Sequence, residues 1–209
     1  MKKALKIVVL AKQVPDTRNV GKDAMTPEGT VNRAALPAIF NPEDLNALEM
    51  ALALKDETEG ATVHILTMGP PRAADIIRDA MFRGVDGGYL LTDRKFAGAD
   101  TLATSYALSC ALRKIRPDVI VAGRQAIDGD TAQVGPQISE HLGIPNISYA
   151  EEIKVEGDSV IVKRQYEDRY HVLKAKMPCL ITALSELNEP RYMTPGGIMD
   201  AYASEITVW

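Results

Sequence analysis

The sequence predicts an α/β fold, with a doubly wound, mostly parallel sheet followed by a C-terminal antiparallel β extension. Over residues 1–150, short β-branched runs alternate with longer amphipathic runs, which is typical of parallel sheets covered by helices. Beyond residue 150, strand-like runs are joined by short turns such as Glu156-Gly157-Asp158, which are hairpin signals. The chain has 209 residues and is 46% hydrophobic and 25% charged, a composition that supports one globular core of this kind.

The first predicted elements are a buried strand and a capped helix. Apart from Lys6, residues 5–11 form an apolar run, which is typical of a strand covered on both faces. A polar loop rich in glycine and proline follows. Asn41 can accept hydrogen bonds from the free N–H groups at a helix start, and Pro42 suits the first helical position. A helix is therefore predicted from there to about Lys55.

The alternation continues along the chain. Strands are predicted over residues 61–68, 88–91, 118–122 and 146–149. Helices are predicted over residues 99–115 and 131–142. A further helix is predicted between the strands at 61–68 and 88–91, with Ile76, Ile77, Ala80 and Met81 on its apolar face. Residues 153–155, 159–166, 170–176 and 179–183 are assigned to the antiparallel extension. Residues 1–184 are thus expected to form one α/β domain, with a β-hairpin extension from about residue 151. Residues 185–209 are rich in proline and glycine, so an exposed loop is expected there.

Composition and charge exclude several classes of protein. The chain has 24 Lys and Arg against 28 Asp and Glu, and its basic residues are scattered, so no nucleic-acid partner is predicted. No stretch approaches the roughly 20 apolar residues that span a bilayer, so no membrane span is predicted. Cys110 and Cys179 lie far apart and show no disulfide or metal-ligand pattern. We therefore expect a cytoplasmic protein without a metal site.

The fold class also locates the candidate site, because ligands of parallel α/β sheets bind beyond the carboxyl ends of the strands. Residues 123–135 leave a predicted strand at this edge and enter a helix. Glycines let the backbone approach a ligand, and the free N–H groups of Thr131, Ala132 and Gln133 would point at an anion. The stretch is equally compatible with a plain Asp-Gly-Asp-Thr helix cap. Spacing alone leaves both interpretations open.

A second loop is a candidate for the same site. Asp100 or Thr101 can cap the helix predicted over residues 99–115, and Thr101, Thr104 and Ser105 place hydroxyls on its first turns, where a diphosphate could bind. Taken alone, this loop favours the capping interpretation. The chain contains neither a GxGxxG nor a Walker A pattern, and no nucleophile has an evident histidine partner, so hydrolase chemistry is not predicted.

Four segments resemble those of the electron transfer flavoprotein β subunit. They are NP at residues 41–42, MGP at 68–70, GRQAIDGD at 123–130 and LNEPRY at 187–192, and the resemblance extends over almost the whole chain. It implies an adenine-nucleotide α-hydrolase-like sheet that binds AMP or FAD. It also implies a heterodimer with an α subunit that carries the electron-transferring FAD. The domain formed by residues 1–184 would then be the nucleotide-binding domain.

The resemblance further implies which residues make the contacts. For the nucleotide these are Ala11, Asn41 to Asp44, Met68, Gly123, Arg124, Gln125, Asp128, Gly129, Asp130, Thr131, Ala132, Gln133 and Val134. For partner dehydrogenases they are the recognition loop Tyr192, Met193, Thr194, Pro195, Gly196, Gly197, Ile198 and Met199. Pro195 stands where the family usually has an anchoring leucine. Family members usually continue into an arm that wraps the α subunit, so a truncated arm is expected near Trp209.

Two further segments resemble one branch of the family. GADTLATS at residues 98–105, which includes Asp100, Thr101 and Thr104, and VPDT at residues 14–17 are similar to flavin-bifurcating and nitrogen-fixation-associated members, whose β subunit binds FAD. The resemblance implies that NADH donates a hydride to this flavin. One electron then passes to ferredoxin or flavodoxin, and the other to the α-subunit FAD and an acyl-CoA dehydrogenase. The alternatives are a β subunit with a structural AMP and a nucleotide-binding regulatory module of the same fold.

Overall fold

The structure, a computed structural model, describes residues 4–16, 18, 27, 36–184 and 188–209. Its centre is a nine-stranded sheet with the order β11-β5-β4-β1-β6-β10-β7-β8-β9. These strands are β1 (Lys6–Leu10), β4 (Thr62–Met68), β5 (Gly87–Leu91), β6 (Val119–Gly123), β7 (Asn146–Glu156), β8 (Ser159–Tyr166), β9 (Arg169–Lys176), β10 (Cys179–Ala183) and β11 (Thr207–Val208). All neighbours from β11 to β7 pair in parallel, and β8 and β9 continue the sheet as antiparallel strands. The predicted α/β class with a mostly parallel sheet is confirmed.

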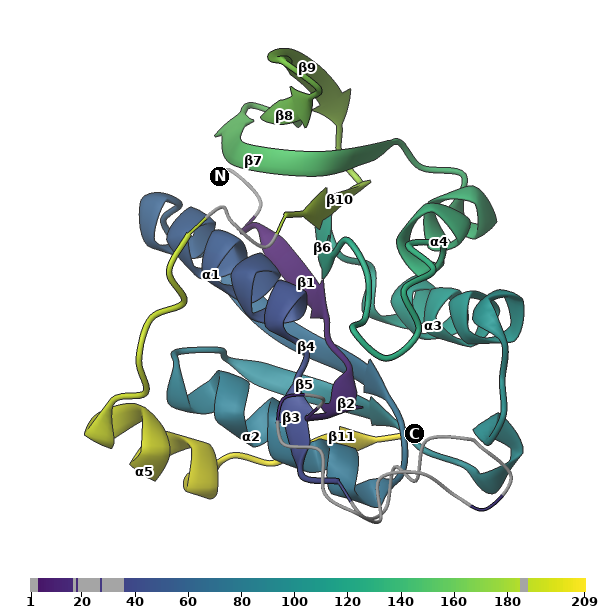
Figure 1. Ribbon diagram of the computed structural model, residues 1–209. Coiled ribbons are helices and arrows are strands. Elements are labelled where there is room, and N and C mark those ends of the chain that lie inside the picture. Colours follow the sequence, from purple (N-terminus) through teal and green to yellow (C-terminus); the bar gives the residue numbers. More distant parts are fainter. Residues whose placement is uncertain (1–3, 17, 19–26, 28–35, 185–187) are drawn as a thin grey trace.

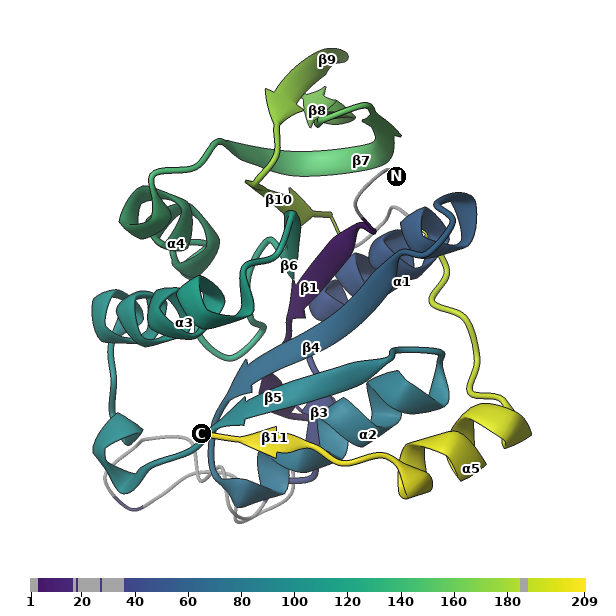
Figure 2. The same ribbon diagram turned by 180° about the vertical axis from the view of Figure 1, so that it is seen from behind.

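Helices cover both faces of this sheet (Figure 1, Figure 2). They are α1 (Pro42–Glu57), α2 (Ala74–Phe82), α3 (Thr101–Ile115), α4 (Val134–Leu142) and α5 (Pro195–Ala203), with short 3₁₀ helices at Pro71–Ala73 and Arg94–Phe96. Ile7 and Val9 of β1 belong to the core that includes α1 and α2, whereas Val8 and Leu10 belong to the core that includes α3 and α4. Successive strand side chains point to opposite faces, so a strand covered on both sides is apolar throughout.

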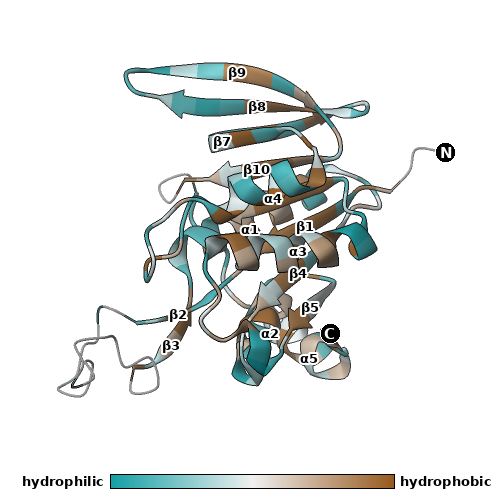
Figure 3. Cartoon of the chain, turned by 90° about the vertical axis from the view of Figure 1, so that its right-hand side faces the viewer, coloured by the Kyte–Doolittle hydropathy of each residue, from teal (hydrophilic) through white to brown (hydrophobic). Residues whose placement is uncertain are grey.

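Strand β10 departs from the sequence prediction. Residues 179–183 were assigned to the antiparallel extension, and this assignment is wrong, because β10 lies between β6 and β7 and runs parallel to both. All of its residues are buried. The chain therefore leaves the parallel sheet through β7, forms the hairpin of β8 and β9, and returns to the position beside β6. The hairpin projects beyond the helices and carries many hydrophilic residues (Figure 3).

Strand β7 replaces two of the predicted strands. It runs without a break from Asn146 to Glu156, whereas the sequence predicted separate strands over residues 146–149 and 153–155. Tyr149 has a φ of 62°, and the pairing with β8 shifts register between Ala150 and Glu152. Such a bulge bends a strand. Here it lies where β7 passes from the parallel part of the sheet into the antiparallel part.

The polar loop predicted after the first strand contains a small second sheet. β2 (Gln13–Pro15) and β3 (Ala38–Phe40) pair as antiparallel strands. Most of the loop between them lies outside the described residues, as do Thr17 of the VPDT segment and Leu187 of the LNEPRY segment. Among the helices that the structure describes, none combines the length and the apolarity that crossing a membrane requires.

The tail expected to be an exposed loop is largely regular structure, which corrects the sequence prediction. Residues 195–203 form α5, and residues 207–208 form β11 at the edge of the sheet beside β5. Pro195 occupies the first turn of α5, where its missing N–H costs nothing. Proline and glycine therefore marked a helix start here, not a loop.

Helix α5 packs on α2 and leaves its outer side exposed. The guanidinium of Arg78 on α2 donates hydrogen bonds to the carbonyl oxygens of Ala201 and Ser204. The hydroxyl of Thr194 accepts a hydrogen bond from the N–H of Gly197 and caps the helix. Among the predicted partner contacts, the large apolar side chains of Tyr192, Met193, Ile198 and Met199 are exposed, and so is that of Tyr202. We therefore expect the tail to contribute to the stability of the fold.

The packing of α5 should require glycine at position 197 but not at position 196. A methyl group on Gly197 would lie 2.5 Å from the carbonyl oxygen of Phe82, whereas one on Gly196 would meet no atom of the described residues within 4 Å. We expect Gly197→Ala to lower the free energy of unfolding by about 1–3 kcal/mol. Gly196→Ala should leave it unchanged or raise it by up to about 1 kcal/mol, since alanine favours helix. Urea unfolding measures both, and equal effects would contradict this packing.

Candidate functional site

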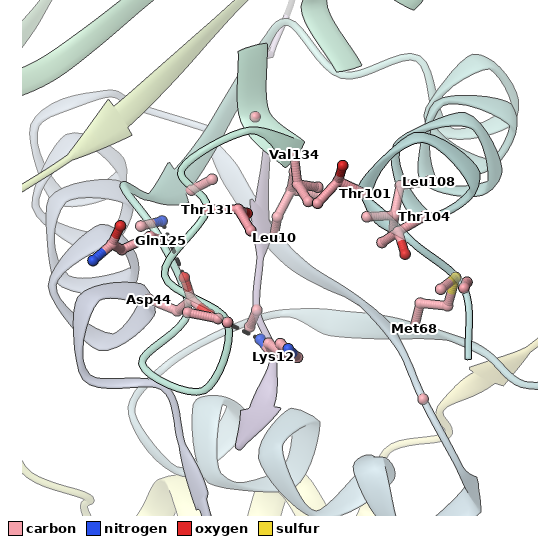
Figure 4. A pocket seen from close by; sticks show the side chains of 18 of the residues that line it. Leu10, Lys12, Asp44, Met68, Thr101, Thr104, Leu108, Gln125, Thr131 and Val134 are labelled. Atoms are coloured by element: carbon pink, nitrogen blue, oxygen red, sulfur yellow. Dashed lines mark hydrogen bonds between the residues drawn. The ribbon is translucent and has the colours of Figure 1, made fainter. Parts of the chain in front are cut away.

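A cavity of about 720 Å³ opens at the carboxyl ends of β1, β4 and β6. Its walls are the residues after β1 and β4, the start of α3, and the loop that joins β6 to α4 (Figure 4). The strand order reverses here, because β4 and β5 extend the sheet to one side of β1 and β6 lies on the other. Open α/β sheets bind ligands at such a switch point.

Most of the sequence-predicted nucleotide contacts line this cavity. They are Ala11, Asp44, Met68, Asp100, Thr101, Thr104, Gly123, Arg124, Gln125, Gly129, Asp130, Thr131, Ala132, Gln133 and Val134. The cavity lining does not include Asn41, Pro42, Glu43 or Asp128. Asn41 is fully buried, and the carboxylate of Asp128 forms an ion pair with Nζ of Lys12 at 2.7 Å.

The first turn of α1 holds the loop that follows β6. Nδ2 of Asn41 donates to the carbonyl oxygen of Gln125 at 2.9 Å, and Oδ1 of Asn41 accepts from the N–H of Ile127 at 3.1 Å. The carboxylate of Glu43 accepts from the N–H of Gln125 and from the guanidinium of Arg124, both at 2.8 Å. Asn41 precedes the helix as predicted, but its side chain makes no capping hydrogen bond because it binds this loop instead.

Strand β6 approaches α1 so closely that its last residue has no room for a side chain. A Cβ on Gly123 would lie 2.5 Å from Oδ1 of Asp44 and 2.8 Å from backbone and Cβ atoms of Glu43. The sequence suggested that glycines in this stretch let the backbone approach a ligand. At Gly123 the close approach is to the first turn of α1.

Asp44 is a buried carboxylate that joins two strand ends. It accepts hydrogen bonds from the N–H of Lys12 after β1 at 2.8 Å and from the N–H of Gly123 in β6 at 3.1 Å. Burial disfavours the charged form and raises the pKa of Asp44 from 3.8 to about 7. Hydrogen bonds from Lys12, Asn41 and Gly123 oppose this shift, and the neighbouring Glu43 adds to it.

Residues 131–133 precede the helix that the sequence predicted to include them, since α4 begins at Val134. Asp130 and Ala132 have left-handed φ values of 47° and 52°, whereas Gln133 is right-handed. Successive residues of alternating hand turn their N–H groups into one concavity, which is an anion-binding arrangement. The first turn of α4 then adds N–H groups that have no partner within the helix.

Ala132→Gly should stabilise the nucleotide-free protein, because glycine adopts left-handed backbone without the clash that a Cβ causes. We expect a gain of up to about 1 kcal/mol in the free energy of unfolding, whereas Ala132→Val should lose at least about 1 kcal/mol. Gly129→Ala is the control, because a Cβ there would meet no atom of the described part of the chain within 4 Å and Gly129 does not have a left-handed φ. If urea unfolding showed that Ala132→Val is more stable than Ala132→Gly, residue 132 would not be under backbone strain.

The start of α3 faces this loop across the cavity. Asp100 caps α3 by accepting a hydrogen bond from the N–H of Ala103 at 2.8 Å, as the sequence predicted for Asp100 or Thr101. Oγ1 of Thr101 donates to Oε1 of Gln133 at 2.9 Å and so connects the two helix starts. Thr104 lines the cavity one turn further along α3 (Figure 4). Ser105 is buried outside it.

Other residues of the cavity were missed because most of them carry no distinctive chemistry. They are Leu10, Lys12, Gln13, Leu66, Gly69, Pro70, Ala73, Phe96, Ala97, Gly98, Ala99, Leu108, Ala122, Ala126 and Gly135. Apolar members such as Leu108 follow the same periodic pattern as core residues. Lys12 had one signal, its position directly after the first strand.

Comparison with known proteins adds an independent finding. A family model described as "Electron transfer flavoprotein domain" matches residues 28–209. The caffeyl-CoA reductase-Etf complex subunit CarD of Acetobacterium woodii is 52% identical over 206 residues, which cover 98% of this chain and 78% of that protein. The electron transfer flavoprotein subunit beta of Clostridium acetobutylicum is 50% identical over 98% of this chain and 78% of its own length. Protein FixA of Azorhizobium caulinodans is 46% identical, with coverages of 97% and 74%.

Proposed function

The chain belongs to the electron transfer flavoprotein β-subunit family, in the flavin-bifurcating and nitrogen-fixation-associated branch, and we propose on this basis that it binds FAD in the cavity. Bound there, FAD would accept a hydride from NADH and pass its two electrons on singly. One electron would go to ferredoxin or flavodoxin, and the other, through the FAD of an α subunit, to an acyl-CoA dehydrogenase. The β subunit would perform this function only in a heterodimer with that α subunit.

The convergence of two helix starts on one cavity carries the proposal. The N-terminal ends of α3 and α4 both face it, and the hydrogen bond between Thr101 and Gln133 connects them. A helix start favours a phosphate through its free N–H groups and its dipole. One such site suffices for the single phosphate of AMP, whereas two can share the diphosphate of FAD. The volume also lies within the range of roughly 300–1,000 Å³ that is common for cofactor sites.

Different residues of the cavity would bind different parts of this ligand. N–H groups of residues 131–133 and the hydroxyls of Thr101 and Thr104 would bind the phosphates. Apolar side chains such as Met68 and Leu108 would shape the cavity and exclude water. Lys12, which Asp128 holds at 2.7 Å, places a positive charge beside the ends of β1 and β6.

Partner choice is supported by the relatives and by the exposed tail. CarD is named as a subunit of a caffeyl-CoA reductase-Etf complex, which favours an acyl-CoA dehydrogenase as a partner here. The exposed side chains of Tyr192, Met193, Ile198 and Met199 offer an apolar surface for such contact. We propose that this surface docks the dehydrogenase and that the complex works in the cytoplasm.

Identification of the bound nucleotide tests the proposal. The chain should be purified with its α subunit, the nucleotides released and identified by mass, and FAD counted per heterodimer. Two FAD per heterodimer is the expected result. One FAD and one AMP, even after supply of excess FAD, would assign the cavity to a structural AMP. A chain that forms no heterodimer and binds a nucleotide reversibly would favour the regulatory module.

A further inference from the structure

Both carboxylate oxygens of Glu43 are engaged by the loop after β6. Oε1 accepts from the guanidinium of Arg124 and Oε2 from the N–H of Gln125, each at 2.8 Å. The side chain of Glu43 is only 7% exposed, and the residue does not line the cavity, whereas Arg124 and Gln125 both do. Glu43 is thus a buried carboxylate whose hydrogen bonds connect it to two residues of the cavity wall.

We propose that Glu43 is a positioning residue for the nucleotide site, one that never touches the ligand but fixes the loop that does. The contacts continue from Glu43 toward the anion site, because Nε2 of Gln125 donates to Oδ1 of Asp130 at 2.9 Å. Asp130 is the first of the two left-handed residues there. Anchoring Gln125 therefore sets the start of the backbone whose N–H groups would bind phosphate. This role rests on the proposed function of the cavity.

The same helix contains a matched control. Glu49, further along α1, accepts from the N–H of Arg191 at 2.9 Å and from the guanidinium of the same arginine. Its environment thus repeats the backbone and guanidinium contacts of Glu43, but Glu49 and Arg191 lie away from the cavity lining. A purely structural role for these carboxylates predicts the same result for Glu43→Gln and Glu49→Gln. A positioning role predicts different results.

The test titrates FAD and AMP into the full chain freed of nucleotide, for the wild type, the single variants Glu43→Gln, Glu49→Gln and Arg124→Gln, and the double variant that combines Arg124→Gln with Glu43→Gln. Loss of one charge-assisted hydrogen bond predicts that Glu43→Gln weakens binding about tenfold. Glu49→Gln should change it less than about twofold, although urea unfolding should show similar losses of stability for both. In the Arg124→Gln background, Glu43→Gln should have a smaller effect, since one of its two links is already absent.

Hydrogen exchange of residues 123–127 without nucleotide separates this proposal from the proposed function. Faster exchange of the Gln125 N–H in Glu43→Gln, but not in Glu49→Gln, is expected even if the wild type binds neither FAD nor AMP. Unchanged affinity in Glu43→Gln, equal weakening in Glu49→Gln, or tighter binding in Glu43→Gln would each overturn the positioning role. Tighter binding would mean that Glu43 acts by masking the charge of Arg124.

Discussion

Replacing Thr101 and Thr104 together with valine is expected to weaken FAD binding by a hundredfold or more while leaving AMP binding nearly unchanged. Both residues line the cavity from the first turns of α3, opposite the loop before α4. Each hydrogen bond lost to a charged phosphate costs about 1.5–3 kcal/mol, so two correspond to roughly a hundredfold to ten-thousandfold in affinity. AMP has one phosphate, which the loop before α4 can bind alone. Fluorescence titration with each nucleotide measures the difference.

Ser109→Ala is a suitable control for this experiment. Ser109 lies two turns further along α3, is buried, and donates its hydroxyl hydrogen bond to the carbonyl oxygen of Tyr106. It does not line the cavity, so its loss should affect stability without changing either affinity. If the double valine variant weakened FAD and AMP equally, the assignment of two phosphate sites would fail, and Thr101 would be reduced to linking α3 with Gln133.

The nucleotide-free protein should become less stable as the pH rises from about 4 to 7, because of Asp44. The unfolded chain releases the Asp44 proton near pH 3.8, whereas burial raises the pKa in the folded protein to about 7. Between these values the folded state binds more protons, so the free energy of unfolding falls with increasing pH. The stabilisation that the protonated Asp44 provides is complete below pH 3.8 and is lost by pH 7. A pKa difference of about three units corresponds to on the order of 4 kcal/mol in the free energy of unfolding.

Asp44→Asn isolates this contribution from every other titrating group. Asparagine does not titrate, so the variant lacks the pH-dependent contribution of Asp44. The wild type should therefore exceed the variant in free energy of unfolding by more at pH 4 than at pH 8. Its amide also places an NH₂ group where Asp44 accepts from Lys12 or Gly123, a cost that should not depend on pH. The same difference at both pH values would show that Asp44 is ionised throughout.

Local patterns located the candidate site well but assigned some of its residues the wrong role. The stretches before α3 and before α4 were expected to meet at one edge of the sheet, and both line one cavity. The side chain of Asn41 was expected to cap a helix, yet it binds the backbone of Gln125 and Ile127 instead. Partners more than 80 positions apart leave no trace in the spacing of a single sequence, because only folding brings them together.

The sequence by itself determined the α/β class, the family and the edge of the sheet where the cavity lies. These follow from periodicity, helix starts and short motifs, all of which act over a few neighbouring residues. Only the tertiary structure decided that β10 lies between β6 and β7, that α5 packs on α2, and that Asp130 and Ala132 are left-handed. The positions of β10 and α5 depend on contacts between distant segments, whose packing free energy outweighs local preference.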